Sequence, residues 1–331
     1  MSRRPTALAV RVPSASELGS LRLENVPRPV SGPGEVLVAV QAAAVNRSDV
    51  LSVRGLMPMT TFPRVPGRDF AGVVVEGPAD LHGRRVWGCG GSDFGFTQDG
   101  SHAELLVVPL EAAVPMPETM SFDDAAASAL AYFTAYEALT RAGEVNSGST
   151  VLVTGAAGAV GTAASSLAAR RGARVIGAVR GSEVRTLGQA SGLHVVIDTE
   201  TDDVATAIRE ATDGRGVDLA VDTVGGTLLA SVLGCLAQGA GVCVISSSPA
   251  TPIGFDVLDF YRAELHLTGL NTGRLDCRRA AEVLRSLQPG FDDGTLRAPR
   301  IASRHPLAGA AAAYEKVQDG AGGRVLILPT A

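Results

Sequence analysis

The sequence is poor in cysteine, in clustered basic residues and in long apolar runs, and each shortage excludes a class of protein. None of its four cysteines belongs to a C-x-x-C pair, and their spacing matches no zinc ribbon. Basic residues never stand more than two in a row and the formal net charge is −5, so a nucleic-acid-binding face is not expected. The longest apolar run, near residues 125–133, is far shorter than the roughly 20 residues of a membrane-spanning helix.

The same shortages predict where the protein works. The apolar stretch Ala7–Val10 ends at Arg11 and is too short for the core of a signal peptide. Cysteines without a pairing pattern are typical of free thiols in a reducing compartment. We therefore expect a cytoplasmic protein whose partners include neither nucleic acid nor a membrane.

Length and composition favour two folded domains. The chain has 331 residues, whereas a typical domain has roughly 100–150. A content of 46% hydrophobic and 19% charged residues indicates a packed core rather than disorder. In the first hundred residues, short β-branched runs such as 36–40 and 71–75 are bounded by proline and glycine, as strands are. This part is predicted to be rich in β-strands.

The pattern changes after Pro115–Pro117. Ser121 and Asp124 have the spacing of a capping box, so a helix is expected to follow, as far as Leu139. Strand-like and helix-like segments then alternate, which predicts a parallel sheet with helices on both faces. The predicted strands are 151–154, 174–179, 195–198, 217–222 and 241–246, and the helices are 159–171, 183–190 and 202–212, the last capped by Asp202. Helices at 278–288 and 307–317 and a strand at 324–328 are expected to follow.

A glycine-spaced turn after the first of these strands is the most specific local signal. Residues 151–161 read VLVTGAAGAVG. Small residues let the backbone approach a pyrophosphate, and a helix N-terminus supplies N–H donors. The spacing is G-x-x-G-x-x-G rather than G-x-G-x-x-G, and tight helix–strand packing is the alternative reading; the flanking strand–helix units favour dinucleotide binding. The cofactor-binding residues predicted here are Gly155, Ala156, Ala157, Gly158, Ala159 and Val160.

The end of the second strand indicates which dinucleotide binds. An NAD-binding protein places an acid about 20 residues after the glycines, for the ribose 2′-hydroxyl. This chain has Arg180 there, followed by Ser182 and Arg185. Guanidinium groups suit a 2′-phosphate, so the predicted cofactor is NADPH. The alternative is that both arginines are solvated residues at the start of a helix.

Several dispersed motifs resemble the zinc-free quinone oxidoreductase (zeta-crystallin-like) branch of the medium-chain dehydrogenase/reductase superfamily. They are AAVNRSD at 43–49, VPGRDFAG at 65–72, GSHAE at 100–104, YFTAY at 132–136, the glycine turn, and AYE at 313–315 with GRVL at 323–326. The resemblance implies an α/β fold in which a Rossmann doubly wound parallel sheet is inserted in a β-rich, GroES-like catalytic domain. Residues 1–125 and 267–331 would form the catalytic domain and 126–266 the NADPH-binding domain, with the active site in the cleft between them.

The resemblance also implies site residues and an assembly. In relatives the positions of Asn46 and Thr134 lie near the nicotinamide, and those of Ser246, Ser247 and the loop containing Asn271 line the cofactor. Relatives commonly form homodimers through the edge of the Rossmann sheet. Residues 265–270 are either that edge or an interior strand.

The sequence offers no ligand set for a metal. Zinc-dependent relatives have a cysteine at the position of Asn46 and a Gly-His-Glu run where this chain has Gly67-Arg68-Asp69. A catalytic zinc needs three protein ligands and an open position. His102 is expected to be a hydrogen-bonded structural residue. We therefore predict a zinc-independent protein.

Without a Lewis acid, acceptors that delocalise charge themselves are favoured, such as quinones and α,β-unsaturated carbonyls. The predicted function is hydride transfer from NADPH to such a small-molecule acceptor, with Asn46, Asp49 and Thr134 as candidate catalytic residues. Asp49 could instead cap a turn. Many relatives carry a tyrosine at the place of Leu51, so tyrosine-assisted reduction is not expected. The alternatives are an enoyl or ketone reductase of a biosynthetic pathway and a cofactor-binding protein with a structural or regulatory role.

Overall fold

The computed structural model describes residues 5–181, 192–247 and 251–330. The chain divides into two compact units. The first unit comprises Met1–Phe133, Thr272–Gly294 and Ala298–Ala331, and the second comprises Thr134–Asn271 and Thr295–Arg297. The division falls within helix α2 (Phe122–Ala142) rather than at the expected residue 125, and the Leu130 N–H within α2 donates to Asp69 Oδ1 of the first unit.

A seven-stranded sheet forms the centre of the first unit, in the order β14-β15-β3-β4-β5-β7, with β6 also paired to β3. These strands are β3 (Glu35–Val45), β4 (Asp69–Glu76), β5 (Arg85–Cys89), β6 (Leu105–Pro109), β7 (Val114–Pro115), β14 (Ile301–Pro306) and β15 (Arg324–Leu328). A separate antiparallel pair consists of β1 (Thr6–Arg11) and β2 (Arg22–Pro27), and the helices are α1 (Arg47–Val53), α8 (Cys277–Asp292) and α9 (Ala310–Gln318). Short 3₁₀ turns lie at Leu18–Ser20, Leu110–Ala112, Thr272–Arg274 and Leu307–Gly309.

Strand β3 positions the candidate site of this unit. It runs antiparallel to both β4 and β15, with Ala42 paired to Ala71 and Val45 paired to Val325. The carboxyl end of β3 therefore meets the amino ends of β4 and β15. Residues that follow β3 and residues that begin β4 and β15 are brought together, although they are far apart in the sequence.

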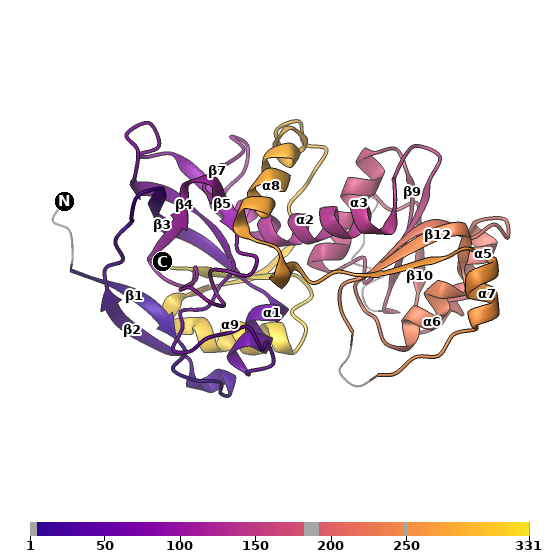
Figure 1. Ribbon diagram of the computed structural model, residues 1–331, viewed down its shortest axis with the longest axis horizontal. Helices are drawn as coiled ribbons and strands as arrows, with labels where there is room; N and C mark the ends of the chain where they lie inside the picture. The colour runs from indigo at the N-terminus through magenta and orange to yellow at the C-terminus, as the bar shows by residue number, and fades with distance from the viewer. Residues whose placement is uncertain (1–4, 182–191, 248–250, 331) are drawn as a thin grey trace. The chain divides into compact units, whose positions relative to one another are not determined.

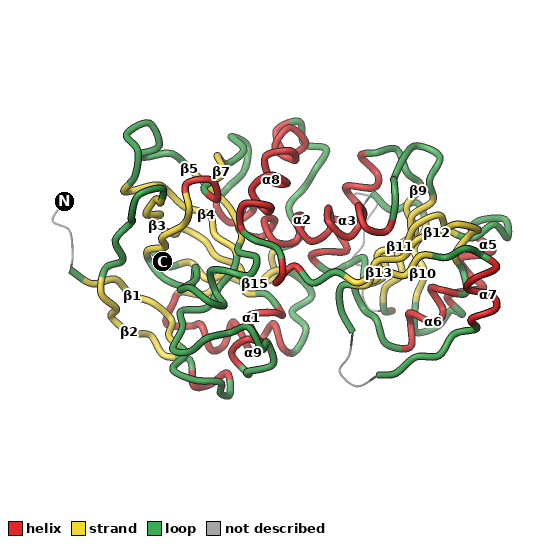
Figure 2. The backbone as a smooth tube through the Cα atoms, viewed as in Figure 1, coloured by secondary structure: helices red, strands yellow, loops and turns green. Residues whose placement is uncertain are grey.

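The second unit contains a six-stranded parallel sheet in the order β10-β9-β8-β11-β12-β13. The strands are β8 (Thr150–Thr154), β9 (Arg174–Val179), β10 (Val195–Asp198), β11 (Val217–Asp222), β12 (Leu236–Val244) and β13 (His266–Gly269), and the helices are α3 (Ala159–Arg170), α5 (Val204–Ala211), α6 (Thr227–Leu233) and α7 (Val257–Arg262). The strand order reverses direction at β8 and β11. Helices α3 and α6 lie on opposite faces of the sheet, as Figures 1 and 2 show. The predicted doubly wound fold is confirmed.

Most predicted elements of this sheet are present, and two of them have other bounds than expected. The helix expected at 202–212 begins at Val204, and its cap is Asp203, which accepts from the Thr206 N–H. Asp202 instead accepts from the Asp198 N–H and so belongs to the turn before the helix. The strand expected at 241–246 runs earlier, over Leu236–Val244. The helix expected at 183–190 lies outside the described residues.

Ser121 caps α2 at the predicted place, but Asp124 accepts from the Ser121 hydroxyl, whereas in a capping box it would accept from the Ser121 backbone N–H. The Asp124 N–H donates to Ser121 Oγ at 3.1 Å, and Ser121 Oγ donates to the Asp124 carboxylate at 2.7 Å. Helix α1 had no counterpart among the sequence expectations. Its capping residues, Asn46 and Asp49, are functional candidates whose local role was left open.

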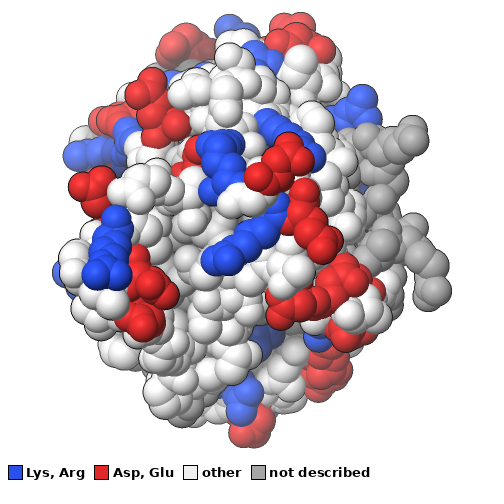
Figure 3. Space-filling view, turned by 90° about the vertical axis from the view of Figure 1, so that its right-hand side faces the viewer, with Lys and Arg blue, Asp and Glu red and all other residues white. Residues whose placement is uncertain are grey.

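The surface agrees with the composition. Within the described ranges, no helix is long and apolar enough to cross a membrane. The face shown in Figure 3 carries acidic and basic side chains interspersed, without a broad field of one sign among the residues drawn in colour.

Candidate functional site

The glycine turn joins the end of β8 to the first turn of α3. Gly155 has φ +60°, a left-handed conformation that glycine adopts without strain. A Cβ at Gly161 would lie 2.2 Å from the carbonyl oxygen of Gly155, so only glycine lets the helix pack this closely on the turn. Gly158 is the exposed N-cap of α3 and has no side chain to cover the first N–H groups. The turn therefore leaves a helix N-terminus open to an anion, as a pyrophosphate site requires.

A carboxylate that the sequence expectations did not include supports this turn. Asp222 ends β11 and is fully buried. Its Oδ1 accepts from Thr154 Oγ1 and from the N–H groups of Val224 and Gly225, at 2.5, 3.1 and 3.0 Å. It thereby joins the end of β8 to the loop after β11. An acid at the end of a buried strand, just before a Gly-Gly pair, was the available sequence signal.

The segments predicted to line the cofactor follow other strands of the same sheet. Ser246 and Ser247 come after β12, and the Gly226 N–H donates to Ser247 Oγ at 3.3 Å. A Cβ at Gly225 would lie 2.2 Å from the carbonyl oxygen of Ser246, so the two loops are in close contact. Asn271 follows β13, whose direction is the same. The structure thus collects the glycine turn, both serines and Asn271 at the carboxyl edge of the sheet, where dinucleotides bind in this class of fold.

Arg180 is exposed directly after β9, at the same edge. It is not the only charged group there. A Cβ at the neighbouring Gly181 would lie 2.8 Å from Glu200 Oε2 and 3.0 Å from Asp198 Oδ2. Two carboxylates therefore lie beside Gly181, the residue that follows Arg180. The other two predicted residues, Ser182 and Arg185, lie outside the described residues.

In the first unit, Asn46 is the centre of a buried polar network. Its Nδ2 donates to Asp69 Oδ2 at 2.7 Å and to Asp49 Oδ2 at 3.1 Å, and its Oδ1 accepts from Arg324 Nη1 at 3.0 Å. Arg324 Nη2 also forms an ion pair with Asp69 at 2.9 Å. These residues come from the end of β3, α1 and the starts of β4 and β15, so the sheet topology assembles them.

Asp49 performs the turn-capping role that the sequence left as an alternative. It accepts from the Asn46 N–H at 2.7 Å and completes a capping box at the start of α1. The side chain is fully buried, and its Oδ1 has no hydrogen-bond partner within the described part of the protein. Burial raises the pKa of Asp49 to about 6, while the positive charges of Arg68 and Arg324 oppose the rise. This carboxyl can therefore change its charge close to neutral pH.

The expected structural role of His102 is confirmed. Its Nε2 lies 3.3 Å from the carbonyl oxygen of Ala44, and its Nδ1 lies 2.9 Å from the Tyr314 hydroxyl. Because a carbonyl can only accept, Nε2 must carry the proton and the Tyr314 hydroxyl must donate to Nδ1. Burial lowers the pKa of His102 to about 4, so the ring is neutral.

The residues at the positions where zinc-dependent relatives carry ligands do not fit zinc. Arg68 is buried and carries a positive charge; its guanidinium donates to the carbonyl oxygens of Gly90 and Gly91 and to Ser48 Oγ. The oxygens of Asp69 are taken up by three donors, namely Leu130, Asn46 and Arg324. No group of three or more His, Cys, Asp or Glu side chains in the described ranges is arranged to hold a metal ion.

Thr134 lies in α2, at the boundary where the second unit begins, and its side chain is buried.

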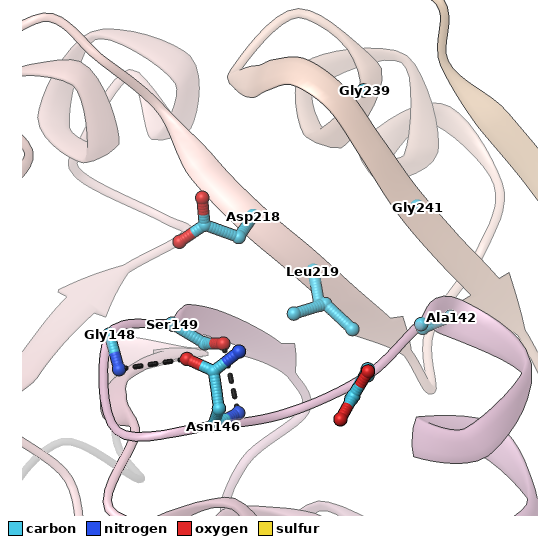
Figure 4. Close-up of a pocket in the computed structure, with 10 residues that line it drawn as sticks. Ala142, Asn146, Gly148, Ser149, Asp218, Leu219, Gly239 and Gly241 are labelled. Carbon is cyan, nitrogen blue, oxygen red and sulfur yellow. Dashed lines mark hydrogen bonds between the residues drawn. The ribbon is translucent and has the colours of Figure 1, made fainter.

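A separate hollow of about 360 Å³ also belongs to the second unit. Figure 4 shows that Ser149 and Asp218, from the amino ends of β8 and β11, line it, together with the loop that Asn146 closes. This is the edge opposite the glycine turn, so the hollow is not the dinucleotide site.

Comparison with known proteins agrees with both units. Residues 32–118 match the alcohol dehydrogenase GroES-like domain, and residues 159–286 match the zinc-binding dehydrogenase family. Among solved structures, a probable oxidoreductase from Mycobacterium abscessus has a TM-score of 0.82 at 30% identity and covers 98% of this chain and 100% of its own. A mycobacterial quinone oxidoreductase has a TM-score of 0.82 at 27% identity, with the same two coverages.

Curated relatives extend the likeness along the sequence. A zinc-type alcohol dehydrogenase-like protein of Schizosaccharomyces pombe is 36% identical, covering 84% of this chain and 82% of its own. The quinone oxidoreductase of Lama guanicoe is 29% identical over 97% of both chains. A mycocerosic acid synthase-like polyketide synthase of Mycolicibacterium smegmatis is 31% identical over 92% of this chain and 14% of its own. Together with the doubly wound sheet and the GroES-like unit, these relatives show that the chain is an oxidoreductase of the medium-chain dehydrogenase/reductase superfamily, in its quinone oxidoreductase branch.

Proposed function

We propose that this protein transfers hydride from NADPH to a quinone or to an α,β-unsaturated carbonyl compound, without zinc. The observation that carries the proposal is the pairing of an open glycine turn in the second unit with a donor set in the first unit that does not fit a metal. When bound, a reduced nicotinamide supplies the hydride. Gly155 to Val160 would hold the pyrophosphate through backbone N–H groups. Ser246, Ser247 and Asn271, at the same edge of the sheet, would line the rest of the dinucleotide.

The catalytic role of the first unit is proposed to be positioning. A quinone or an enone spreads the incoming charge over its own π system, so an arrangement that orients the reactants can be sufficient. Asn46 and Thr134 are the candidates for contact with the reacting groups. Asp49, buried behind Asn46, would act through Asn46 rather than on the substrate directly.

The protein is first dialysed, and its zinc content is measured by elemental analysis. The reaction is then followed by NADPH absorbance with quinones, enones, enoyl thioesters and aliphatic ketones. We expect turnover of quinones or enones in protein that contains no stoichiometric zinc. Turnover of ketones alone, or one zinc per chain whose removal abolishes activity, would contradict the proposal. Tight NADPH binding with no turnover of any acceptor would favour a non-enzymatic role.

The preference for NADPH is proposed to depend on Arg180. A charge-assisted contact to the 2′-phosphate is worth roughly 1.5–3 kcal/mol, so NADPH should bind more tightly than NADH in fluorescence titrations. Arg180→Ala with Arg185→Ala should remove the difference. Arg174→Ala, at the opposite end of β9, is the matched control. Equal affinities of NADPH and NADH for the unmodified protein would contradict this preference.

A second candidate function is an enoyl reductase of a biosynthetic pathway. The observation in its favour is the likeness to part of a mycocerosic acid synthase-like polyketide synthase, which covers nearly this whole chain. An enoyl thioester is itself an activated alkene, so the chemistry required of the site is the same. Faster turnover of enoyl thioesters than of quinones in the same assay would favour this candidate.

We also propose a homodimer in the cytoplasm. Strand β13 forms one edge of the six-stranded sheet, which decides between the two readings of 265–270. Helix α7, just before it, has no buried residue and exposes Val257 and Tyr261. An apolar patch beside an open strand edge is suited to pairing with a second copy. The four cysteines are buried free thiols, which supports a reducing compartment.

A further inference from the structure

The buried acid Asp222 contacts the ends of three neighbouring strands in the second unit. It ends β11, which lies between β8 and β12 in the sheet. Its Oδ1 accepts from the Thr154 hydroxyl at the end of β8 and from two N–H groups of the loop after β11, residues 223–226. Its backbone carbonyl oxygen accepts from the Ile245 N–H, directly after β12, at 3.0 Å. One residue therefore bonds to all three strand ends.

Thr154 connects this loop to the glycine turn. Its hydroxyl donates to Asp222 and accepts from the Thr223 N–H at 3.0 Å, and its carbonyl oxygen accepts from the Thr223 hydroxyl at 2.8 Å. The next residue is Gly155, where a Cβ would lie 2.4 Å from Thr223 Oγ1. The loop after β11 is therefore fixed against the first residue of the glycine turn.

The same loop also packs against the serine segment, residues 246–247. A Cβ at Gly225 would lie 2.2 Å from the Ser246 carbonyl oxygen and 2.7 Å from Ser247 Cα. The Gly226 N–H donates to Ser247 Oγ at 3.3 Å. Because Asp222 holds the Gly225 N–H at 3.0 Å, the spacing between the glycine turn and the serine segment depends on this one carboxyl group.

We propose that Asp222 is a positioning residue for the dinucleotide, which sets the spacing between the glycine turn and the serine segment without contacting the ligand. This rests on the proposed function, in which both segments hold the cofactor. The Asp222 side chain is fully buried, so it acts through Thr154 and the loop. Its Oδ2 has no hydrogen-bond partner in the described part of the protein, so the connection depends on Oδ1. An amide oxygen could accept the same three bonds, whereas a methyl group could accept none.

The connection is tested first without any cofactor, by hydrogen–deuterium exchange of residues 154–158 and 245–247. Asp222→Ala should speed exchange in both segments, because the loop between them is released. Asp218→Ala is the matched control and should leave both segments unchanged. Asp218 also accepts from a β8 N–H, that of Thr150 at 2.7 Å, but at the opposite end of the same two strands. Faster exchange confined to residues 223–226 would overturn the proposal.

The effect on the cofactor is tested by fluorescence titration with NADPH. Asp222→Ala should bind NADPH about tenfold more weakly, and Asp222→Asn should recover most of the affinity because it keeps the acceptor. Thr154→Val removes the hydroxyl that joins Asp222 to β8 and should have the same effect, with recovery in Thr154→Ser. This second pair decides the proposal if Asp222→Ala does not fold. Asp218→Ala should bind NADPH as the unmodified protein does.

The outcomes separate this inference from the proposed function. In turnover assays, Asp222→Ala should raise the KM for NADPH and leave kcat at saturating NADPH nearly unchanged. Unchanged NADPH affinity in both Asp222→Ala and Thr154→Val would overturn the positioning role while leaving the proposed function intact. NADPH binding without turnover of any acceptor would overturn the proposed function alone. An unmodified protein that does not bind NADPH would overturn both.

Discussion

At the residue scale, the buried groups of the first unit show how one side chain combines structural and chemical roles. Asn46 is the N-cap of α1 and also the hub of an ion-pair network with Asp69 and Arg324. Removing one partner of such a pair leaves a buried charge without compensation, which is costly. Substitutions here will therefore change folding as well as activity, and tests need readouts that separate the two effects.

The titration of Asp49 gives a prediction about stability. The unfolded carboxyl loses its proton near pH 3.8 and the folded one near pH 6, so between these values the folded state binds more protons and stability falls as pH rises. His102 has the opposite effect. Its pKa falls from 6.5 to about 4, so in the same window the unfolded state binds more protons and stability rises with pH. The two effects, each about 1.4 kcal/mol per pH unit, nearly cancel.

Asp49→Asn should remove the first effect and leave the second. The asparagine can still accept from the Asn46 N–H, so the cap is kept. Between pH 4 and 6 the free energy of unfolding of the variant, relative to the unmodified protein, should therefore rise by about 1.4 kcal/mol per pH unit. Urea titrations at several pH values measure this difference, with the exposed Asp80→Asn as control. Parallel profiles for the variant and the unmodified protein would show that Asp49 does not titrate in this window.

At the scale of elements, the glycine turn depends on how closely α3 approaches β8. Gly161 packs against backbone atoms, because a Cβ there would lie 2.2 Å from the Gly155 carbonyl oxygen and 2.7 Å from Ala156 Cα. At Gly158 the nearest such atom is at 3.2 Å. The two glycines therefore serve different purposes: Gly161 permits close packing, and Gly158 leaves the helix N-terminus uncovered.

Gly161→Ala is expected to destabilise the protein by roughly 1–3 kcal/mol, because the turn must move away from the helix. The same movement should weaken NADPH binding. Gly158→Ala is the matched control for stability and should cost much less. Denaturant unfolding and cofactor titration of both variants test this, and equal stability of the two would contradict the packing argument.

At the scale of the whole molecule, the proposed dimer forms through the exposed edge of the six-stranded sheet, so substitutions at this edge should change the sedimentation of the protein. The chain should sediment at twice its mass of 33.8 kDa. Leu267→Glu on β13 should yield monomers, since it introduces a charge into an apolar contact. Val30→Glu is the control, because Val30 is a strongly exposed apolar residue of the first unit. A monomeric unmodified protein, or dimers that persist in Leu267→Glu, would argue against this edge.

The sequence by itself determined the doubly wound sheet, the glycine turn and the family, because strand–helix alternation and glycine spacing are local patterns. It also predicted the structural role of His102. Only the tertiary structure joined Asn46, Asp69 and Arg324, which lie up to 278 positions apart and meet because β3 is antiparallel to both β4 and β15. It likewise decided that β13 lies at the edge of its sheet and that Asp203 caps α5. Each of these depends on which groups come into contact in the folded protein, and residue spacing along the sequence does not determine those contacts.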